Sequence, residues 1–303
     1  MNDLTGLFVP LITPFTADGA IAAEALECLA RLVLGDGATG IVALGTTAET
    51  PTLTEAEQSE VLRICRRVCR EHGAPLIVGA GSNNTARSAL ALADVAQFPE
   101  VRAALTVVPY YSRPGEAGVL EHFRTLTASS RVPLVVYNIP YRTGQPVGWP
   151  VMRQLAAMPG IVGVKHSAGS IDADTIAMMA ERPAGFSVLG GDCLYLSPLL
   201  ALGADGAISA AAHLCTDAFA RLIDLWRDGQ AAEARHLGHR LAPLSRALFA
   251  EPNPAVIKSA LYRLGEIPSP AVRLPLLAAR PESTKSALQA RQVLSASRSD
   301  SSF

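Results

Sequence analysis

The feature that most constrains this sequence is a series of eight short apolar segments, which alternate with longer segments of helical pattern. The apolar segments are nearly continuous in apolar residues, which is typical of parallel strands buried on both faces. They recur about every 25 to 35 residues, which is the length of one strand and one helix. The segments are 6–15, 40–49, 75–81, 103–111, 133–140, 160–167, 186–192 and 203–210.

The segments between them are rich in alanine, leucine, glutamate and arginine, as in 22–34, 55–72 and 85–98. Thr54 precedes an acidic first turn and is therefore predicted to be a helix N-cap. Eight strands alternating with helices over about 210 residues predict a (β/α)8 TIM barrel in the α/β class. A doubly wound open sheet is the alternative, but no G-x-G-x-x-G motif follows the first strand.

The pattern becomes wholly helical after the eighth apolar segment. We predict a barrel core over residues 1–212. The last barrel helix and an appended C-terminal helical subdomain are predicted over 213–292, because this stretch holds more helix than a barrel needs. The final residues, 293–303, are rich in serine and have little to bury, so we expect a disordered tail.

Composition narrows the class of protein. A hydrophobic fraction of 49% is ample for a large core, and a net charge of −1 argues against a nucleic-acid-binding face. No apolar stretch approaches the ~18 residues of a membrane helix, and the N-terminus lacks the pattern of a signal peptide. The five cysteines are scattered without a CxxC pair, which disfavours disulfides and zinc. We therefore expect a cytoplasmic protein that acts on small molecules and binds neither nucleic acid nor membrane.

Active sites of TIM barrels lie at the carboxyl ends of the strands, where polar residues of this chain gather. No strand end offers a cluster of histidines or carboxylates, so a metal is disfavoured. The polar groups are instead hydroxyls, phenols and two cations, which suit carbonyl chemistry. They are Thr46 and Thr47 at the end of the second segment, Tyr110 and Tyr111 at the end of the fourth, Tyr137 and Arg142 near the end of and after the fifth, and Lys165 in the sixth.

Lys165 is the most informative of these residues. The chain has only three lysines against 23 arginines, and one of the three ends a buried-looking strand. An arginine cannot form a Schiff base because its guanidinium stays protonated, whereas burial lowers the pKa of a lysine amine. Lys165 alone would equally fit an ordinary cation at a strand end. The phenols and hydroxyls at the same rim favour a nucleophile, and Arg142 is suited to bind a substrate carboxylate.

Seven motifs resemble the dihydrodipicolinate synthase and N-acetylneuraminate lyase family of class I aldolases. They follow one another over almost the whole chain: VPLITPF (9–15), GTTAET (45–50), PYYSRP (109–114), YNIPYRTG (137–144), GVKHSAG (163–169), EPNPAVIK (251–258) and VRLPL (272–276). PYYSRP and YNIPYRTG are most similar to the members that condense pyruvate with L-aspartate 4-semialdehyde on the lysine and diaminopimelate pathway. The resemblance implies a homotetramer built from dimers, and a lysine imine with pyruvate in place of any cofactor or metal.

The resemblance implies four catalytic residues. Lys165 would form the Schiff base with pyruvate, and Tyr137 would be the general acid and base beside it. Thr46 and Tyr111 would complete a proton relay with Tyr137. Tyr111 would reach in from a neighbouring subunit, so dimerisation would be needed for activity.

Four further residues are implied to bind the substrates. Thr47 would hold the pyruvate carboxylate, and Arg142 the carboxylate of the semialdehyde. Gly191 and Ile208 would line the same pocket.

Two positions depart from the most common pattern of the family. His166 follows the lysine where many synthases carry an acid, and Tyr141 precedes Arg142 where small residues are usual. His166 alternates to the opposite face of its strand, so we expect it to pack outward. Tyr141 is bulky enough to narrow the entrance or change the aldehyde that is accepted.

Regulation follows from the same resemblance. Arg87 stands where an acidic residue binds the ammonium of the effector in lysine-inhibited members, and Glu55 and Gln58 stand where histidines are usual. We therefore expect weak or no inhibition by L-lysine. The matching positions are Thr50, Pro51, Glu55, Gln58, Asn83, Arg87 and Tyr110.

The residues leave other functions open. An aldolase for a 2-oxo acid sugar is disfavoured by Arg142, whereas a deaminating or dehydrating relative that acts on a cyclic imino acid would share Lys165 and Tyr137. A catalytically silent barrel that serves as a binding protein is disfavoured by the complete set of polar groups. The physiological aldehyde, and whether the chain is the main pathway enzyme or a paralogue, are not determined by the sequence.

Overall fold

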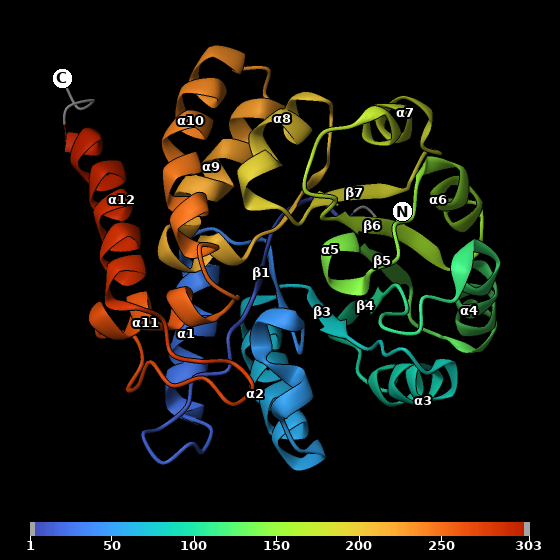
Figure 1. Cartoon of the computed structure of the whole chain (residues 1–303), viewed down its shortest axis with the longest axis horizontal. Coiled ribbons are helices and arrows are strands. Elements are labelled where there is room, and N and C mark those ends of the chain that lie inside the picture. Colours follow the sequence, from blue (N-terminus) through green and yellow to red (C-terminus); the bar gives the residue numbers. More distant parts are fainter. Residues whose placement is uncertain (1–3, 300–303) are drawn as a thin grey trace.

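The computed structural model describes residues 4–299, in which eight parallel strands form a closed barrel (Figure 1). Each strand pairs with the next in sequence, and β8 returns to pair with β1. This confirms the predicted TIM barrel. The strands are β1 (Gly6–Pro10), β2 (Gly40–Ala43), β3 (Leu76–Gly79), β4 (Val101–Val107), β5 (Leu134–Asn138), β6 (Ile161–His166), β7 (Ser187–Gly190) and β8 (Gly206–Ile208).

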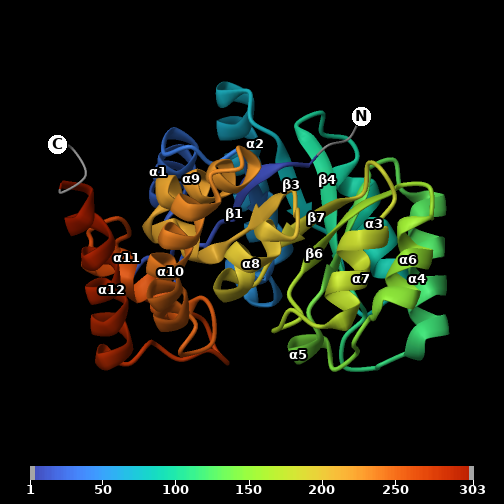
Figure 2. The same ribbon diagram turned by 90° about the horizontal axis from the view of Figure 1, so that it is seen from above.

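Helices connect the strands and surround them (Figure 2). Thr54 caps the second helix as predicted, because its hydroxyl accepts from Glu57 N while the Glu57 carboxylate accepts from Thr54 N. The helices are α1 (Ala23–Gly35), α2 (Glu55–His72), α3 (Thr85–Val95), α4 (Gly115–Ser129), the short α5 (Pro140–Thr143), α6 (Trp149–Ala156), α7 (Ala173–Glu181), α8 (Leu196–Ala201) and α9 (Thr216–Arg227).

The core has two parts because successive residues of a strand face opposite sides. One set of side chains fills the barrel, and a larger set packs between the strands and the helices. Closure of the barrel needs a close approach of β8 to β1. A Cβ on Gly206 would lie 2.0 Å from the carbonyl oxygen of Gly6, so only glycine fits there. The barrel interior holds Leu4, Phe8, Val42, Ile77, Ala103, Leu105, Val135, Tyr137, Ile139, Leu189 and Ile208.

Three helices follow the barrel and form a subdomain at one side of it (Figures 1 and 2). They are α10 (Ala231–Leu248), α11 (Ala255–Arg263) and α12 (Pro281–Ser299). The tail predicted to be disordered, 293–303, begins inside α12, and this helix continues to Ser299. Residues 300–303 lie outside the described residues. Leu294 is buried and its carbonyl accepts from Arg240 Nη2 at 2.8 Å, which ties this turn of α12 to α10.

Among the described residues, no helix combines the length and apolar character needed to cross a membrane. Within residues 4–299, histidine, cysteine and carboxylate side chains do not gather in a group of three or more that could hold a metal ion.

Candidate active site

Lys165 lies near the carboxyl end of β6, and only 5% of its surface is exposed. Its Nζ lies 4.2 Å from the centre of the Tyr137 ring, on the neighbouring strand β5. Burial lowers the pKa of Lys165 to about 8, with a smaller contribution from the charge of Arg142. No carboxylate forms an ion pair with Lys165 among the described residues. A large fraction of the amine is therefore neutral and nucleophilic near pH 8.

The Tyr137 phenol stays protonated around neutral pH. Burial raises the pKa of Tyr137 to about 12, although Arg142 and the hydroxyls of Thr46 and Ser167 counteract this by stabilising the ionised form. Tyr137 and Lys165 are direct register partners on β5 and β6, which places phenol and amine side by side. A protonated phenol beside a neutral amine can donate a proton to a carbonyl oxygen that the amine attacks.

The two threonines lie on a tight turn that follows β2. Thr46 and Thr47 belong to a 3₁₀ turn, and Glu49 at its end has φ +55, in the left-handed region. Thr13 Oγ1 donates to the carbonyl of Ala48 at 2.8 Å, and Asn253 Nδ2 donates to Thr47 Oγ1 at 2.9 Å. Because the Thr47 oxygen accepts from Asn253, the Thr47 hydroxyl proton is free to point at another acceptor.

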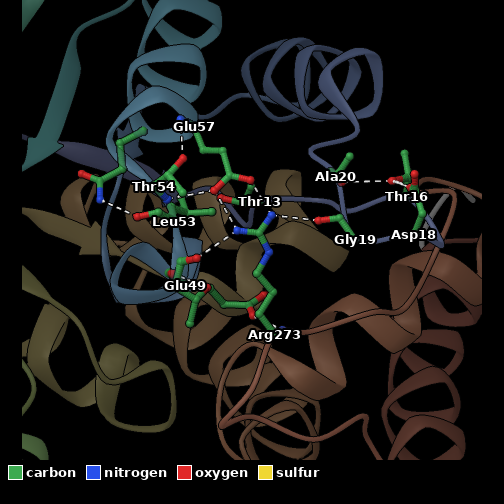
Figure 3. A network of polar contacts seen from close by, with 12 residues as sticks. Thr13, Thr16, Asp18, Gly19, Ala20, Glu49, Leu53, Thr54, Glu57 and Arg273 are labelled. Atoms are coloured by element: carbon green, nitrogen blue, oxygen red, sulfur yellow. Dashed lines mark hydrogen bonds and ion pairs between the residues drawn. The ribbon is translucent and has the colours of Figure 1, made fainter.

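A network of polar contacts holds this turn from behind, and Figure 3 shows its part around Glu49 and Arg273. The Glu49 carboxylate accepts from Lys258 Nζ at 2.5 Å and from the backbone N–H of Arg273 at 2.8 Å. The Arg273 guanidinium in turn donates to the carbonyls of Thr52 and Gly19 and pairs with Glu57 (Figure 3). The C-terminal subdomain therefore fixes the position of a turn on the barrel rim.

Arg142 lies on α5, just after β5, and its neighbour orients it. Arg142 Nε donates to the Tyr141 hydroxyl at 3.2 Å, and the guanidinium carbon lies 5.4 Å from the centre of the Tyr141 ring. This contact uses Nε and leaves the two terminal nitrogens to bind a carboxylate. The departure at Tyr141 thus has a structural consequence: the ring borders the cavity and supports the arginine.

A cavity of about 430 Å³ joins these groups at the carboxyl ends of the strands. All of the site residues predicted from the sequence line it, except Tyr111. The predicted members are Thr46, Thr47, Tyr137, Arg142, Lys165, Gly191 and Ile208, and the lining also includes Ile139, Tyr141, Ser167, Asp192, Ala210 and residues 249–253.

Tyr111 does not reach this cavity. It is 91% exposed and has φ +68, which is unusual for a residue other than glycine. A side chain so exposed cannot serve the Lys165 of its own chain. Its expected action in the site of a neighbouring subunit stays a prediction.

His166 packs outward, as its place on the strand predicts. Its ring is buried, and Nε2 lies 3.1 Å from Thr175 Oγ1 on α7, which itself donates to Asp172 at 2.8 Å. Burial lowers the pKa of His166, so the ring is neutral around pH 7. It lies outside the cavity lining and supports the barrel wall.

The cavity also contains polar residues to which no role was assigned from the sequence. Ser167 stands two places after Lys165, so strand alternation alone predicts that both face the barrel. Asp192 follows Gly191, and burial raises the pKa of its carboxyl. Asn253 comes from the segment between α10 and α11, and no local pattern connects it to a turn more than 200 residues earlier.

A larger cavity of about 1050 Å³ lies among the helices α9 to α12 and shares no residue with the barrel mouth. His213 lies in its wall, where Nε2 accepts from Ile12 N at 3.2 Å and Nδ1 lies 2.9 Å from the carbonyl of Ala210. Burial lowers the pKa of His213 to about 4. This neutral histidine ties the segment after β1 to the segment after β8, which is a structural role.

A closed βα barrel with a buried lysine beside a tyrosine phenol at the barrel mouth is the arrangement used by lyases that act through a lysine imine. The comparisons with known proteins agree with this class. Residues 3–296 match the model of the dihydrodipicolinate synthetase family, to which this chain belongs.

Curated relatives resemble the chain over most of its length. A 4-hydroxy-tetrahydrodipicolinate synthase of Neisseria meningitidis is 38% identical over 90% of this chain and 93% of its own length. One of Methanothrix thermoacetophila is 37% identical over 95% of both chains. The solved structure of this synthase from Methylacidiphilum fumariolicum SolV has a TM-score of 0.91 at 33% identity, and covers 97% of this chain and 98% of its own.

Proposed function

We propose that this protein is a 4-hydroxy-tetrahydrodipicolinate synthase, which condenses pyruvate with L-aspartate 4-semialdehyde on the route to diaminopimelate and lysine. The observation that carries the proposal is the placement of Lys165, Tyr137, Thr47 and Arg142 around one cavity. The names of the curated relatives and solved structures support it. A Schiff-base lyase of this kind needs no metal or separate cofactor.

The reaction begins at Lys165. Its neutral amine attacks C2 of pyruvate, and Tyr137 supplies the proton for the carbonyl oxygen, which then leaves as water. Thr46 lies near enough to stabilise the Tyr137 phenolate. The Thr47 hydroxyl, whose oxygen already accepts from Asn253, donates to the pyruvate carboxylate. The imine draws electrons from the methyl group, which loses a proton to give an enamine.

The second half begins when the enamine carbon attacks the aldehyde. Arg142, held at Nε by Tyr141, binds the carboxylate of the semialdehyde through its two terminal nitrogens. Tyr137 protonates the new alkoxide. The amine of the second substrate then displaces Lys165 from the imine carbon, which closes the ring and regenerates the free lysine.

The experiment that tests the proposal is borohydride reduction with pyruvate, followed by mass spectrometry of the peptide that contains Lys165. We expect a pyruvate-derived adduct on Lys165, and turnover with L-aspartate 4-semialdehyde in a coupled assay. An adduct without turnover of the semialdehyde would indicate that the enzyme acts on another substrate, such as a 2-oxo acid sugar or a cyclic imino acid. A folded protein without an adduct would contradict the proposal.

We also propose a cytoplasmic homotetramer built from dimers, in which the exposed Tyr111 completes the site of a partner. Sedimentation gives the oligomeric state, and Tyr111→Phe measures the contribution of the phenol. We expect a tetramer and a lower rate for the variant. A fully active monomer would contradict the proposal. L-Lysine is expected to inhibit weakly or not at all, because the exposed Arg87 repels its ammonium group.

A further inference from the structure

Ser167 is a buried hydroxyl in the cavity whose bonding the described residues do not complete. It follows β6, and its backbone N–H donates to the carbonyl of Asn138 at 2.9 Å. Its side chain is 98% buried, since the residue is only 2% exposed. Ser167 Oγ makes no hydrogen bond of ordinary geometry with the described residues. A buried polar group without a partner is costly, so such a group at the wall of a cavity indicates a ligand.

Alternation along the strand places Ser167 on the same face as Lys165, while the intervening His166 faces α7. Ser167, Lys165, Tyr137 and Gly191 all line the cavity. The Ser167 hydroxyl is also near enough to the Tyr137 phenol to favour its ionised form. The serine therefore stands beside both groups that carry the chemistry.

Gly191 allows the side chains of Ser167 and Lys165 to approach each other. A Cβ at this position would lie 2.2 Å from Ser167 Oγ and 2.8 Å from Lys165 Cε. Both distances are too short for a side chain, so glycine at position 191 allows Ser167 and Lys165 to pack closely against the backbone there. Ser167 Oγ and the end of the Lys165 side chain therefore lie close together at one wall of the cavity.

We propose that Ser167 is a further catalytic residue, whose hydroxyl carries a proton between the Tyr137 phenol and the oxygen at C2 of the adduct of Lys165 with pyruvate. A hydroxyl suits this task because it donates one hydrogen bond while it accepts another. The inference rests on the proposed function for the identity of the carbonyl substrate, and on the described contacts for the role of the serine.

Two protons move from the Lys165 amine to the departing oxygen during imine formation. The Lys165 nitrogen forms a bond to C2, and the electron pair of the carbonyl double bond moves on to oxygen. That oxygen takes a proton from Ser167, which takes one from Tyr137. The nitrogen returns one proton to Tyr137 as the neutral adduct forms. In the second step the C–O bond breaks, the carbon–nitrogen double bond forms, and the second amine proton reaches the departing oxygen by the same route. One water leaves, and Ser167 and Tyr137 end unchanged.

The test measures exchange of the pyruvate methyl protons in D₂O by proton NMR, which requires the imine but no aldehyde. We expect Ser167→Ala to exchange about 10- to 100-fold more slowly than the unmodified protein, as is usual for loss of a proton-transfer group. Ser167→Thr keeps the hydroxyl and is expected to stay within about threefold. Exchange by a folded Ser167→Ala variant at the unmodified rate would overturn the proposal.

Ser245→Ala is the matched control. Ser245 is equally buried and its hydroxyl also lacks a partner among the described residues, but it lies on α10 outside the cavity. We expect unchanged exchange for this variant. If Ser167→Ala does not fold, Ser167→Cys replaces the hydroxyl by a weak hydrogen-bonding thiol. Its exchange is expected to fall at least about tenfold, and an unchanged rate would overturn the proposal.

The failure of this inference is distinguishable from that of the proposed function. No exchange by the unmodified protein would show that pyruvate is not the substrate, and both proposals would fall. Exchange that is insensitive to the Ser167 variants would remove the role of the serine alone. Sensitive exchange without turnover of the semialdehyde would leave Ser167 in place and change only the aldehyde.

Discussion

Two lysines of this barrel are buried beside aromatic rings, and only one of them is suited to chemistry. Lys165 lies 4.2 Å from the centre of the Tyr137 ring, and Lys258 lies 3.8 Å from that of Phe15. Burial lowers the pKa of each to about 8. Lys258, however, binds the Glu49 carboxylate at 2.5 Å and the carbonyl of Ala271 at 2.9 Å, while Lys165 borders an open cavity.

Lys258 shows that burial alone does not make a lysine a nucleophile. The amine also needs space for a carbonyl compound, a proton donor beside it, and no carboxylate that holds its proton. The turn after β2 separates the two situations, because Thr47 faces the cavity of Lys165 and Glu49 pairs with Lys258 behind it. Lys165 is placed to react with a carbonyl compound, and Lys258 holds the turn beside it.

The largest difference between the two lysines should appear in turnover. We expect Lys165→Ala to lose at least about 10⁴-fold in kcat, because the described residues bring no other amine into the cavity and the imine cannot form. The variant should keep its circular dichroism spectrum and thermal midpoint. Activity within tenfold of the unmodified protein would show that another group is the nucleophile.

Replacement of Lys258 should lower stability, whereas replacement of Lys165 should abolish turnover. Lys258→Met leaves the Glu49 carboxylate buried without its cation, which costs about 3–5 kcal/mol of unfolding free energy in urea titrations. The double variant Lys258→Met with Glu49→Leu removes both charges and should recover most of this loss. If Lys165→Met destabilises the chain as much as Lys258→Met does, the two lysines are not distinguished by their partners.

The pH dependence separates the lysines further. The amine of Lys165 must be neutral to attack, so imine formation with pyruvate should rise with pH and reach half of its plateau at about 8. Borohydride trapping at a series of pH values measures this rise. The pKa of Lys165 is lowered and not raised because desolvation disfavours the ammonium. A midpoint near the ordinary lysine pKa of about 10.4 would mean that the amine is well solvated.

The same lowered pKa affects stability in a calculable direction. The folded state binds fewer protons at Lys165 than the unfolded chain does between pH 8 and the ordinary lysine value. Lys165 therefore contributes a gain in stability as pH rises through this window. The pH dependence of the unfolding free energy of Lys165→Met should lack this contribution.

The smallest effect on activity is expected at Asn253, which links the turn after β2 to the segment between α10 and α11. Asn253→Ala removes the donor to Thr47 Oγ1, which in the proposed complex directs the threonine hydroxyl at the pyruvate carboxylate. We expect the KM for pyruvate to rise about five- to tenfold, equivalent to one hydrogen bond, with a much smaller change in kcat. A fall in kcat with an unchanged KM would place Asn253 in the chemical step and not in substrate binding.

The regular part of the molecule was predictable from local pattern. Apolar segments and helical segments in alternation predicted the barrel, and Thr54 predicted the start of α2, because both signals are local in sequence. The end of α12 was not, since the burial of Leu294 and its bond to Arg240 depend on a helix about fifty residues away. Strand alternation predicts that Ser167 faces the same side as Lys165. Only the tertiary structure shows that the Ser167 hydroxyl makes no hydrogen bond of ordinary geometry with the described residues.

What the sequence determined by itself is the set of chemical groups at the strand ends: a rare lysine, the phenols, the threonines and an arginine, all on one rim because parallel strands end together. The tertiary structure decided which of them meet. It placed the cavity over Lys165, turned Tyr111 outward, and brought Asn253 and Lys258 to the turn at Thr47 and Glu49. These contacts join residues more than 200 positions apart, and packing of the C-terminal subdomain against the barrel creates them.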